Sequence, residues 1–253
     1  MTPFRAILLP GSVLPAELAY PALIRALGPD VEPAVKELEI YATLEVPADY
    51  SLDLEVAGVL READARGWER FHFVGYSGGG AAGLALVARH PERVSSLALL
   101  EPAWAGRTGR SPTEGAVWRR YDRIEALAPN EQLPEFMRIQ VRPGVVLPPP
   151  PPGDPPAWMS KRPDGIRAFL RAFRSSDLDV DALARFDRPV YFALGGLSNP
   201  DQFGEIAVRL AGVFADFRLE VFDARHHFDP PHRVEPERLA ESLRELWRDA
   251  ELA

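Results

Sequence analysis

Ser77 is the residue whose surroundings most clearly indicate chemistry. It lies in Gly75-Tyr76-Ser77-Gly78-Gly79, which has the spacing Gly-x-Ser-x-Gly. A strand-like apolar run, Phe71–Gly75, precedes the serine, and an alanine-rich helical pattern, Gly78–Arg89, follows at once. A serine on such a tight turn is exposed at the carboxyl edge of a sheet, where it can attack a carbonyl carbon. The glycines are needed because a Cβ would clash across the turn. We therefore predict that Ser77 is a nucleophile.

This glycine-rich stretch has two other interpretations. A phosphate-binding loop is disfavoured because no Gly-Lys-Ser/Thr follows, and because the Gly75-x-x-Gly78 spacing differs from that of dinucleotide-binding loops. A structural turn without catalysis is the remaining alternative for Ser77.

A histidine cluster offers candidates for the base that a serine nucleophile requires. His226, His227 and His232 all lie shortly after the last strand-like run. Each could accept the serine proton if its loop folds back over Ser77. These three together with Asp229 could instead form a metal site, but their spacing matches no familiar metal-binding motif. We expect no metal.

Glu101 directly follows the apolar run Ser96–Leu100. An ionisable residue that ends an apolar strand needs an explanation. One explanation is that it orients the imidazole of a serine–histidine pair and stabilises the imidazolium that forms. The alternative is an ion pair at the base of the segment that follows.

The elements that must position these residues alternate along the chain. Strand-like runs are separated by helical patterns, which predicts a mostly parallel, doubly wound α/β sheet. The predicted strands are Arg5–Leu9, Leu38–Leu44, Phe71–Gly75, Ser96–Leu100, Val190–Leu194 and Arg218–Phe222. The predicted helices are Pro15–Leu27, one after the N-cap Ser51, Gly78–Arg89, Gln202–Leu210 and Glu235–Trp247.

The alternation lapses between the fourth and fifth predicted strands. We divide the chain into a core of residues 1–102 and 186–253 and an insertion of residues 103–185, with helical patches at Thr113–Ala126 and Pro163–Phe173. The insertion carries a net charge of +3, against −11 for the rest. That contrast would suit either an anionic substrate or electrostatic docking of the insertion on an acidic core.

Eight prolines crowd positions 143–156, five of them consecutive at Pro148–Pro152. This strap is predicted to be an extended polyproline II segment. It is interpreted as a stiff surface loop. Alternatives are a rigid support for a lid and a docking site for domains that recognise proline-rich segments.

These motifs together resemble the α/β-hydrolase family over nearly the whole chain. Leu8–Ser12 resembles the family's oxyanion loop, with Pro10 in place of the usual histidine. Gly75–Gly79 matches the nucleophile elbow, and His90–Val94 matches a common His-Pro-Glu-Arg-Val segment. The resemblance implies a sheet of eight or slightly fewer strands, a triad in the order serine, acid, histidine, and a cap at the position of the insertion.

The resemblance also favours individual residues for the base and the acid. Family loops often read His-Phe at the base, which favours His227 over His226. In most members the acid follows the next-to-last strand, but Asn199 occupies the position expected for the aspartate here. A minority place the acid one strand earlier, which favours Glu101 and leaves Asp201 as the alternative.

The same resemblance assigns the groups around the nucleophile. The backbone amides of Ser12 and Gly78 are expected to form the oxyanion hole. Tyr76 and Trp104 are candidates for the substrate pocket. The insertion's large apolar residues could line that pocket or form its core, and they are Trp104, Trp118, Phe136, Met137, Trp158 and Met159.

Composition excludes several classes of protein. The 253 residues include no cysteine, which rules out thiolate chemistry and disulfides and indicates a cytoplasmic protein. A net charge of −8 argues against a nucleic-acid partner. No apolar run is long enough to span a bilayer, and the run Ala6–Leu9 is too short for a signal peptide. The sequence carries no signal for an oligomeric state.

We therefore predict a cofactor-independent serine hydrolase that cleaves a small ester or related acyl bond through an acyl-enzyme. The same residues could support carbon–carbon or amide hydrolysis, or cofactor-free peroxidation. The alternative from another class is a non-catalytic, ligand-binding protein of the same fold.

Overall fold

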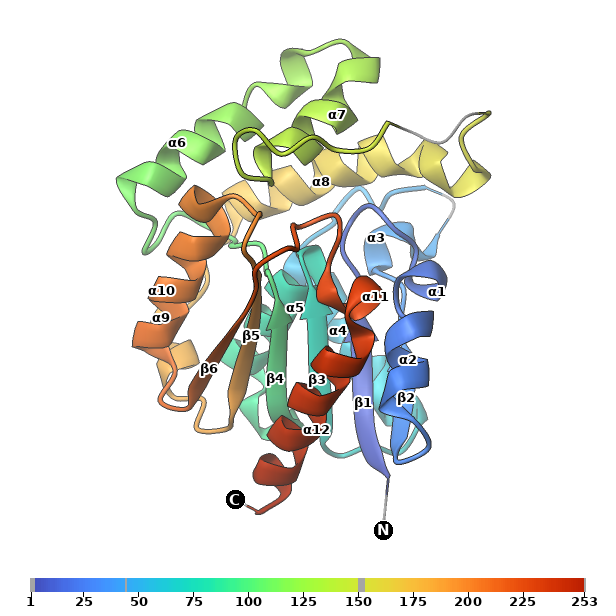
Figure 1. Ribbon diagram of the computed structural model, residues 1–253, viewed down its shortest axis with the longest axis vertical. Coiled ribbons are helices and arrows are strands. Elements are labelled where there is room, and N and C mark those ends of the chain that lie inside the picture. The colour runs from blue at the N-terminus through green and yellow to red at the C-terminus, as the bar shows by residue number, and fades with distance from the viewer. Residues whose placement is uncertain (1–2, 44, 150–152, 253) are drawn as a thin grey trace.

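A computed structural model describes residues 3–43, 45–149 and 153–252 (Figure 1). Within these residues, six strands form one parallel sheet in the order β2-β1-β3-β4-β5-β6. Their bounds are β1 Phe4–Leu9, β2 Val31–Val35, β3 Phe71–Tyr76, β4 Val94–Leu100, β5 Val190–Gly195 and β6 Phe217–Phe222. The predicted doubly wound parallel sheet is confirmed. The chain adds β2 on one side of β1 and then continues with β3 on the other side. In sheets of this kind, a crevice opens at the carboxyl ends of the strands where the order of strands switches in this way.

One predicted strand is wrong. The sheet uses Val31–Val35 as its edge strand β2, whereas Leu38–Leu44 contains the short helix α3, Glu39–Ala42; Leu44 itself lies outside the described residues. Pro33 is tolerated in β2 because an edge strand has no partner on its outer side. The start of α3 is stabilised by the buried carboxylate of Glu55, which accepts the backbone N–H groups of Glu39 and Ile40.

Helices cover both faces of the sheet (Figure 1). Alternate residues of β1 belong to separate cores: Ile7 and Leu9 pack towards one face, Ala6 and Leu8 towards the other. The first face is covered by α4 Leu52–Ala65, α5 Gly78–Arg89, α9 Val180–Ala184 and α10 Glu205–Val213. The second face is covered by α1 Ala16–Ala19, α2 Pro21–Leu27, α11 Pro231–Val234 and α12 Pro236–Leu252.

Two predicted helices are interrupted in the structure. The segment Pro15–Leu27 forms α1 and α2, which separate at Tyr20 because Pro21 has no N–H to continue the first helix. The segment Gln202–Leu210 forms the end of a short π-helical turn, η4 (Pro200–Gly204), and the start of α10.

The insertion lies across the carboxyl ends of the strands (Figure 1). Its elements are α6 Pro112–Tyr121, η2 Ile124–Ala126, α7 Pro129–Ile139, η3 Ala157–Lys161 and α8 Arg162–Ser175. The Asp177 carboxylate joins the two ends of the insertion, because it accepts the backbone N–H groups of Arg107 and Thr108 at 2.6 and 3.1 Å. Helix α9, near the end of residues 103–185, packs instead against α5.

Both predicted helical patches of the insertion correspond to helices, α6 with η2 and α8, whereas α7 had no predicted counterpart. Residues 150–152 of the proline strap lie outside the described residues, so its polyproline II conformation stays a prediction. Across the described ranges, no helix is both long enough and apolar enough to cross a bilayer.

Candidate active site

Ser77 lies on the turn between β3 and α5, with φ 53° and ψ −115°. This left-handed conformation is rare for a residue with a side chain. A Cβ on Gly75 would lie 2.5 Å from the Gly79 carbonyl oxygen, and a Cβ on Gly79 would lie 2.4 Å from the carbonyl oxygen of Leu9. Both positions therefore require glycine, and the close approach of the chain brings the loop after β1 next to Ser77.

Glu101 takes the equivalent position on the neighbouring strand. The register of the sheet pairs Tyr76 with Leu100, so the residues that follow them, Ser77 and Glu101, leave the sheet side by side. The backbone N–H of Ser77 donates to the Leu100 carbonyl at 3.0 Å. Glu101 also has a positive φ, 47°, which turns its side chain away from the direction of the strand.

His227 joins these two residues. Its Nε2 lies 3.0 Å from Ser77 Oγ, and its Nδ1 lies 2.9 Å from Glu101 Oε2. The other carboxylate oxygen of Glu101 accepts the backbone N–H of Gly195 at 2.8 Å, at the end of β5. Both side chains are buried, with His227 1% and Glu101 4% exposed. A proton on Nδ1 satisfies Glu101 and leaves Nε2 free to accept the serine proton.

The imidazole of His227 is held by aromatic rings. Phe203 of η4 stacks on it with ring centroids 4.4 Å apart and an interplanar angle of 13°. Tyr76 lies against it at 4.9 Å, and the Tyr76 hydroxyl donates to the backbone carbonyl of His227. Burial raises the pKa of Tyr76 well above its ordinary value, so the phenol stays protonated as a donor. These contacts restrict rotation of the ring, which keeps its two nitrogens within hydrogen-bonding distance of Ser77 and Glu101.

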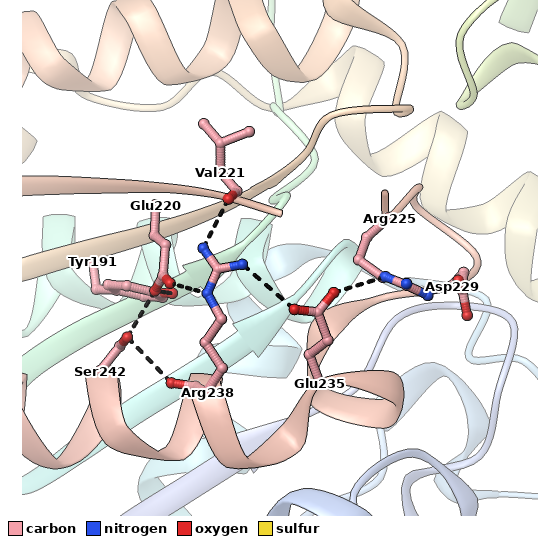
Figure 2. A network of polar contacts seen from close by, with 8 residues as sticks. All are labelled: Tyr191, Glu220, Val221, Arg225, Asp229, Glu235, Arg238 and Ser242. Carbon is pink, nitrogen blue, oxygen red and sulfur yellow. Dashed lines mark hydrogen bonds and ion pairs between the residues drawn. The ribbon is translucent and has the colours of Figure 1, made fainter. Parts of the chain in front are cut away.

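An ion-pair network anchors the loop that carries His227 (Figure 2). Arg225, two residues before the histidine, pairs with Asp229 at 2.7 Å and with Glu235 at 2.8 Å. Glu235 in turn contacts Arg238 of α12, whose guanidinium reaches Glu220 of β6 at 2.6 Å. The loop is thus tied to both a strand and a helix of the core.

The predicted oxyanion donors are the backbone amides of Ser12 and Gly78. Within the described ranges neither N–H donates to a protein acceptor, and both residues line the cavity at Ser77. The amide of Gly78 opens α5, so the positive end of the helix dipole adds to its field. On the other side of the loop, the Ser12 carbonyl accepts the Tyr41 hydroxyl at 2.9 Å, and the guanidinium of Arg162 stacks on the Tyr41 ring at 3.8 Å.

The alternative site residues lie elsewhere. Asp201 is exposed in η4, and its backbone N–H donates to the side chain of Asn199. Asn199 also donates to the Ile139 carbonyl at 2.7 Å, so it attaches the insertion to the core. His226 Nδ1 accepts the Phe228 N–H, and burial lowers the pKa of His226. In the described part of the chain, no group of three or more histidine and acidic residues could hold a metal ion.

A small cavity of about 30 Å³ adjoins Ser77 beneath the insertion. Neither Tyr76 nor Trp104 lines it, in contrast to the prediction: Tyr76 supports His227, and Trp104 is buried with its indole N–H donating to the Thr108 carbonyl. The side chains that do line it are mainly aromatic. The full set is Ser12, Ser77, Gly78, Ala103, Trp118, Tyr121, Phe136, Gln140, Phe169, Leu170, Phe173 and Gln202.

Several lining residues were missed by sequence reasoning. Trp118 and Phe136 were among the insertion's aromatic candidates, but nothing singled out Gln140 or Gln202. The helical period of α8 was a usable signal, since Phe169 and Phe173 are one turn apart and point to the same side.

Comparisons with known proteins agree with this fold. A family profile described as the alpha/beta hydrolase fold matches residues 49–144. A protein named as a putative carbamate hydrolase, RutD from Caulobacter segnis, is 39% identical over 54 residues, 21% of this chain and about a fifth of that protein's length (20%).

Two solved structures are similar over almost the whole chain. An esterase from Thermogutta terrifontis has a TM-score of 0.72 and 18% identity, and the match covers 98% of this chain and 91% of that one. A meta-cleavage product hydrolase from Pseudomonas fluorescens IP01 has a TM-score of 0.65 and 18% identity over 98% of this chain and 92% of that one. At such identities these structures show the fold alone. The parallel sheet and the profile match across the turn at Ser77 together show that this chain has the α/β-hydrolase fold.

Proposed function

We propose that this protein is a serine hydrolase that cleaves a small ester or a related acyl bond. The observation that carries the proposal is the unbroken set of hydrogen bonds from Ser77 Oγ through His227 to Glu101 at the carboxyl edge of the sheet. All three residues are buried, and the serine opens into a cavity. The name of the relative RutD, printed as putative carbamate hydrolase, is consistent with attack on a carbonyl carbon.

In the first half of the reaction, His227 Nε2 takes the proton of Ser77 Oγ as the oxygen attacks the carbonyl carbon. The negative charge that develops on the carbonyl oxygen is stabilised by the N–H groups of Ser12 and Gly78. Glu101 stabilises the imidazolium. His227 then gives its proton to the leaving group, and the bond to that group breaks to leave an acyl-enzyme on Ser77.

In the second half, a water molecule gives a proton to His227 and attacks the acyl carbon. The bond to Ser77 Oγ breaks, and the serine takes back its proton from His227. The chain supplies every proton acceptor and donor that these steps need, so the proposed reaction requires no cofactor. The insertion is proposed to act as a cap, because its aromatic side chains cover the site and exclude bulk water.

Labelling with a fluorophosphonate probe tests the proposal. The wild-type protein should be labelled stoichiometrically, and Ser77→Ala should abolish the label. Ser198→Ala is the matched control, because Ser198 is a buried serine whose hydroxyl has no hydrogen-bond partner in the described structure, and it should be labelled like the wild type. Folded wild-type protein that reacts with no probe and hydrolyses no ester would instead be a ligand-binding protein of this fold.

A further inference from the structure

Two buried carboxamides lie in the wall of the cavity at Ser77. Gln140 follows α7 and is 3% exposed, and Gln202 lies in η4 and is 7% exposed. Asn199 brings them together, because its N–H donates to the Gln140 carbonyl at 3.1 Å and its own carbonyl accepts the Gln202 N–H at 3.2 Å. The insertion and the core thus each contribute one amide side chain to the same wall.

Each carboxamide uses only part of its hydrogen-bonding capacity on the protein. Gln202 Oε1 accepts the Tyr121 hydroxyl at 2.8 Å, and Gln140 Nε2 donates to the Phe136 carbonyl at 3.0 Å. Within the described residues, Gln202 Nε2 therefore has no acceptor and Gln140 Oε1 has no donor. Neither atom is among the fully buried polar atoms without a partner in the described structure, so both remain accessible from the cavity. A ligand that pairs with them replaces their water, whereas a ligand that covers them without pairing leaves them unsatisfied, which is unfavourable.

The rest of the cavity wall carries no charge. In the described part of the chain, no acidic or basic side chain lines it. Burial raises the pKa of Tyr121, so its phenol is neutral. A carboxylate or phosphate that entered this space would lose its hydration without gaining a counter-charge, which is strongly unfavourable.

We propose that the preferred substrate has a small, uncharged acyl group that carries a hydroxyl or carboxamide, which accepts a hydrogen bond from Gln202 and donates one to Gln140. Both of these groups have a donor and an acceptor, whereas an ionised carboxylate has acceptors only. The net charge of +3 on the insertion therefore does not select an anionic acyl group at this site. The inference rests on the proposed hydrolase function and adds the substrate class.

Three p-nitrophenyl esters of similar acyl length test the proposal: the butanoate, the 3-hydroxybutanoate and the hemisuccinate. At pH 7 the wild-type kcat/KM should be about tenfold or more higher for the 3-hydroxybutanoate than for the butanoate, and lowest for the hemisuccinate, because a buried polar wall discriminates against substrates that leave it unpaired. A preference for the hemisuccinate, or equal values for all three, would overturn the proposal.

Substitutions assign that preference to the two glutamines. In Gln202→Met and in Gln140→Met, which keep the approximate volume, the ratio of kcat/KM for the 3-hydroxybutanoate and the butanoate should fall towards one. Gln132→Met is the matched control: Gln132 lies on α7 but outside the cavity wall, bonded to the Leu127 carbonyl and to Arg167, and its substitution should preserve the wild-type ratio.

Binding to Ser77→Ala separates this inference from the proposed function. Calorimetric titration of that variant with the same three esters should show the 3-hydroxybutanoate binding most tightly, and this readout needs no catalysis. Tight binding of that ester without hydrolysis by the wild type would refute the hydrolase proposal and support the ligand class. Labelling at Ser77 combined with equal binding of the three esters would support the hydrolase proposal and refute the substrate class.

Discussion

Replacing Glu101 with glutamine tests whether this carboxylate orients the base. The substituted side chain would keep the shape of the native one, and its carbonyl oxygen would still accept the Gly195 N–H that Glu101 accepts at 2.8 Å. The amide NH₂ must then face His227 Nδ1, which lies 2.9 Å from the second carboxylate oxygen in the native protein. Two donors cannot share that bond, so Nδ1 must lose its proton and Nε2 must carry it.

The wrong tautomer disables the nucleophile. A protonated Nε2, 3.0 Å from Ser77 Oγ, becomes a donor to the hydroxyl and cannot take its proton. A change of this kind in a serine–histidine–acid triad lowers turnover by about 10⁴, which corresponds to about 5 kcal/mol of transition-state stabilisation. We expect kcat to fall by about that factor in Glu101→Gln, with KM changed much less.

The assay is steady-state hydrolysis of a p-nitrophenyl ester, with the free energy of unfolding measured in urea to confirm folding. Glu101→Asp keeps the charge but shortens the side chain, so its activity should lie between those of the wild type and Glu101→Gln. Asp201→Asn, which alters the exposed carboxylate in η4, should match the wild type. If Glu101→Gln retained more than a tenth of the wild-type kcat, or if Asp201→Asn lost activity instead, the assignment of the acid would be refuted.

Three further predictions concern strain, positioning and pH. Ser77→Gly should raise the free energy of unfolding in urea by about 1 kcal/mol relative to Ser77→Ala, because only glycine adopts φ 53° without strain; equal stabilities would contradict this reasoning. Tyr41→Phe removes the hydrogen bond from the Tyr41 hydroxyl to the Ser12 carbonyl, so ester hydrolysis should show a lower kcat at nearly constant KM. The loss in kcat should be smaller than the ~10²–10³-fold loss caused by deleting an oxyanion donor. A change in KM alone would argue against a positioning role for Tyr41. Burial lowers the pKa of His72 and His232 to about 3, so these side chains are neutral in the folded protein, while the unfolded chain binds protons at both below pH ~6.5. The stability that these neutral histidines contribute is complete above that pH and falls by roughly 1.4 kcal/mol per pH unit for each histidine as the pH drops from ~6.5 towards 3. Urea titrations at pH 6.5 and 4.5 should show a smaller change in the free energy of unfolding for His72→Gln than for the wild type. An equal change in both proteins would exclude a contribution from His72.

The local sequence pattern predicted the strand–turn–helix at Ser77 because the constraints there are local. The clash partners of Gly75 and Gly79 lie within the turn or in the loop beside it, so sequence spacing alone reports the geometry. Glu101 was detectable for a similar reason, since a charged residue at the end of an apolar strand stands out. The choice between Glu101 and Asp201 depended on distances, and the structure brings only Glu101 within hydrogen-bonding distance of His227 in the described residues.

The edge of the sheet could not be predicted from apolar runs. Leu38–Leu44 is more apolar than Val31–Val35, but the buried carboxylate of Glu55 caps the helix inside the first segment, and the second pairs with β1. Glu55 is separated from that helix by more than ten residues, so no local window contains both partners. The same limit applies to Tyr76, which the sequence placed near the substrate and the structure places behind His227.

The sequence by itself determined the order of most strands and helices, the turn that strains Ser77, and the set of residues from which a triad could be chosen, because each depends on neighbours along the chain. Tertiary structure decided which residues meet: parallel register sets Ser77 beside Glu101, the anchored loop after β6 places His227 between them, and the insertion brings Gln140 to Gln202 in the wall of the cavity at Ser77. Packing joins residues that are far apart in sequence, and a local pattern can show that a face is buried but not which distant residues it will meet.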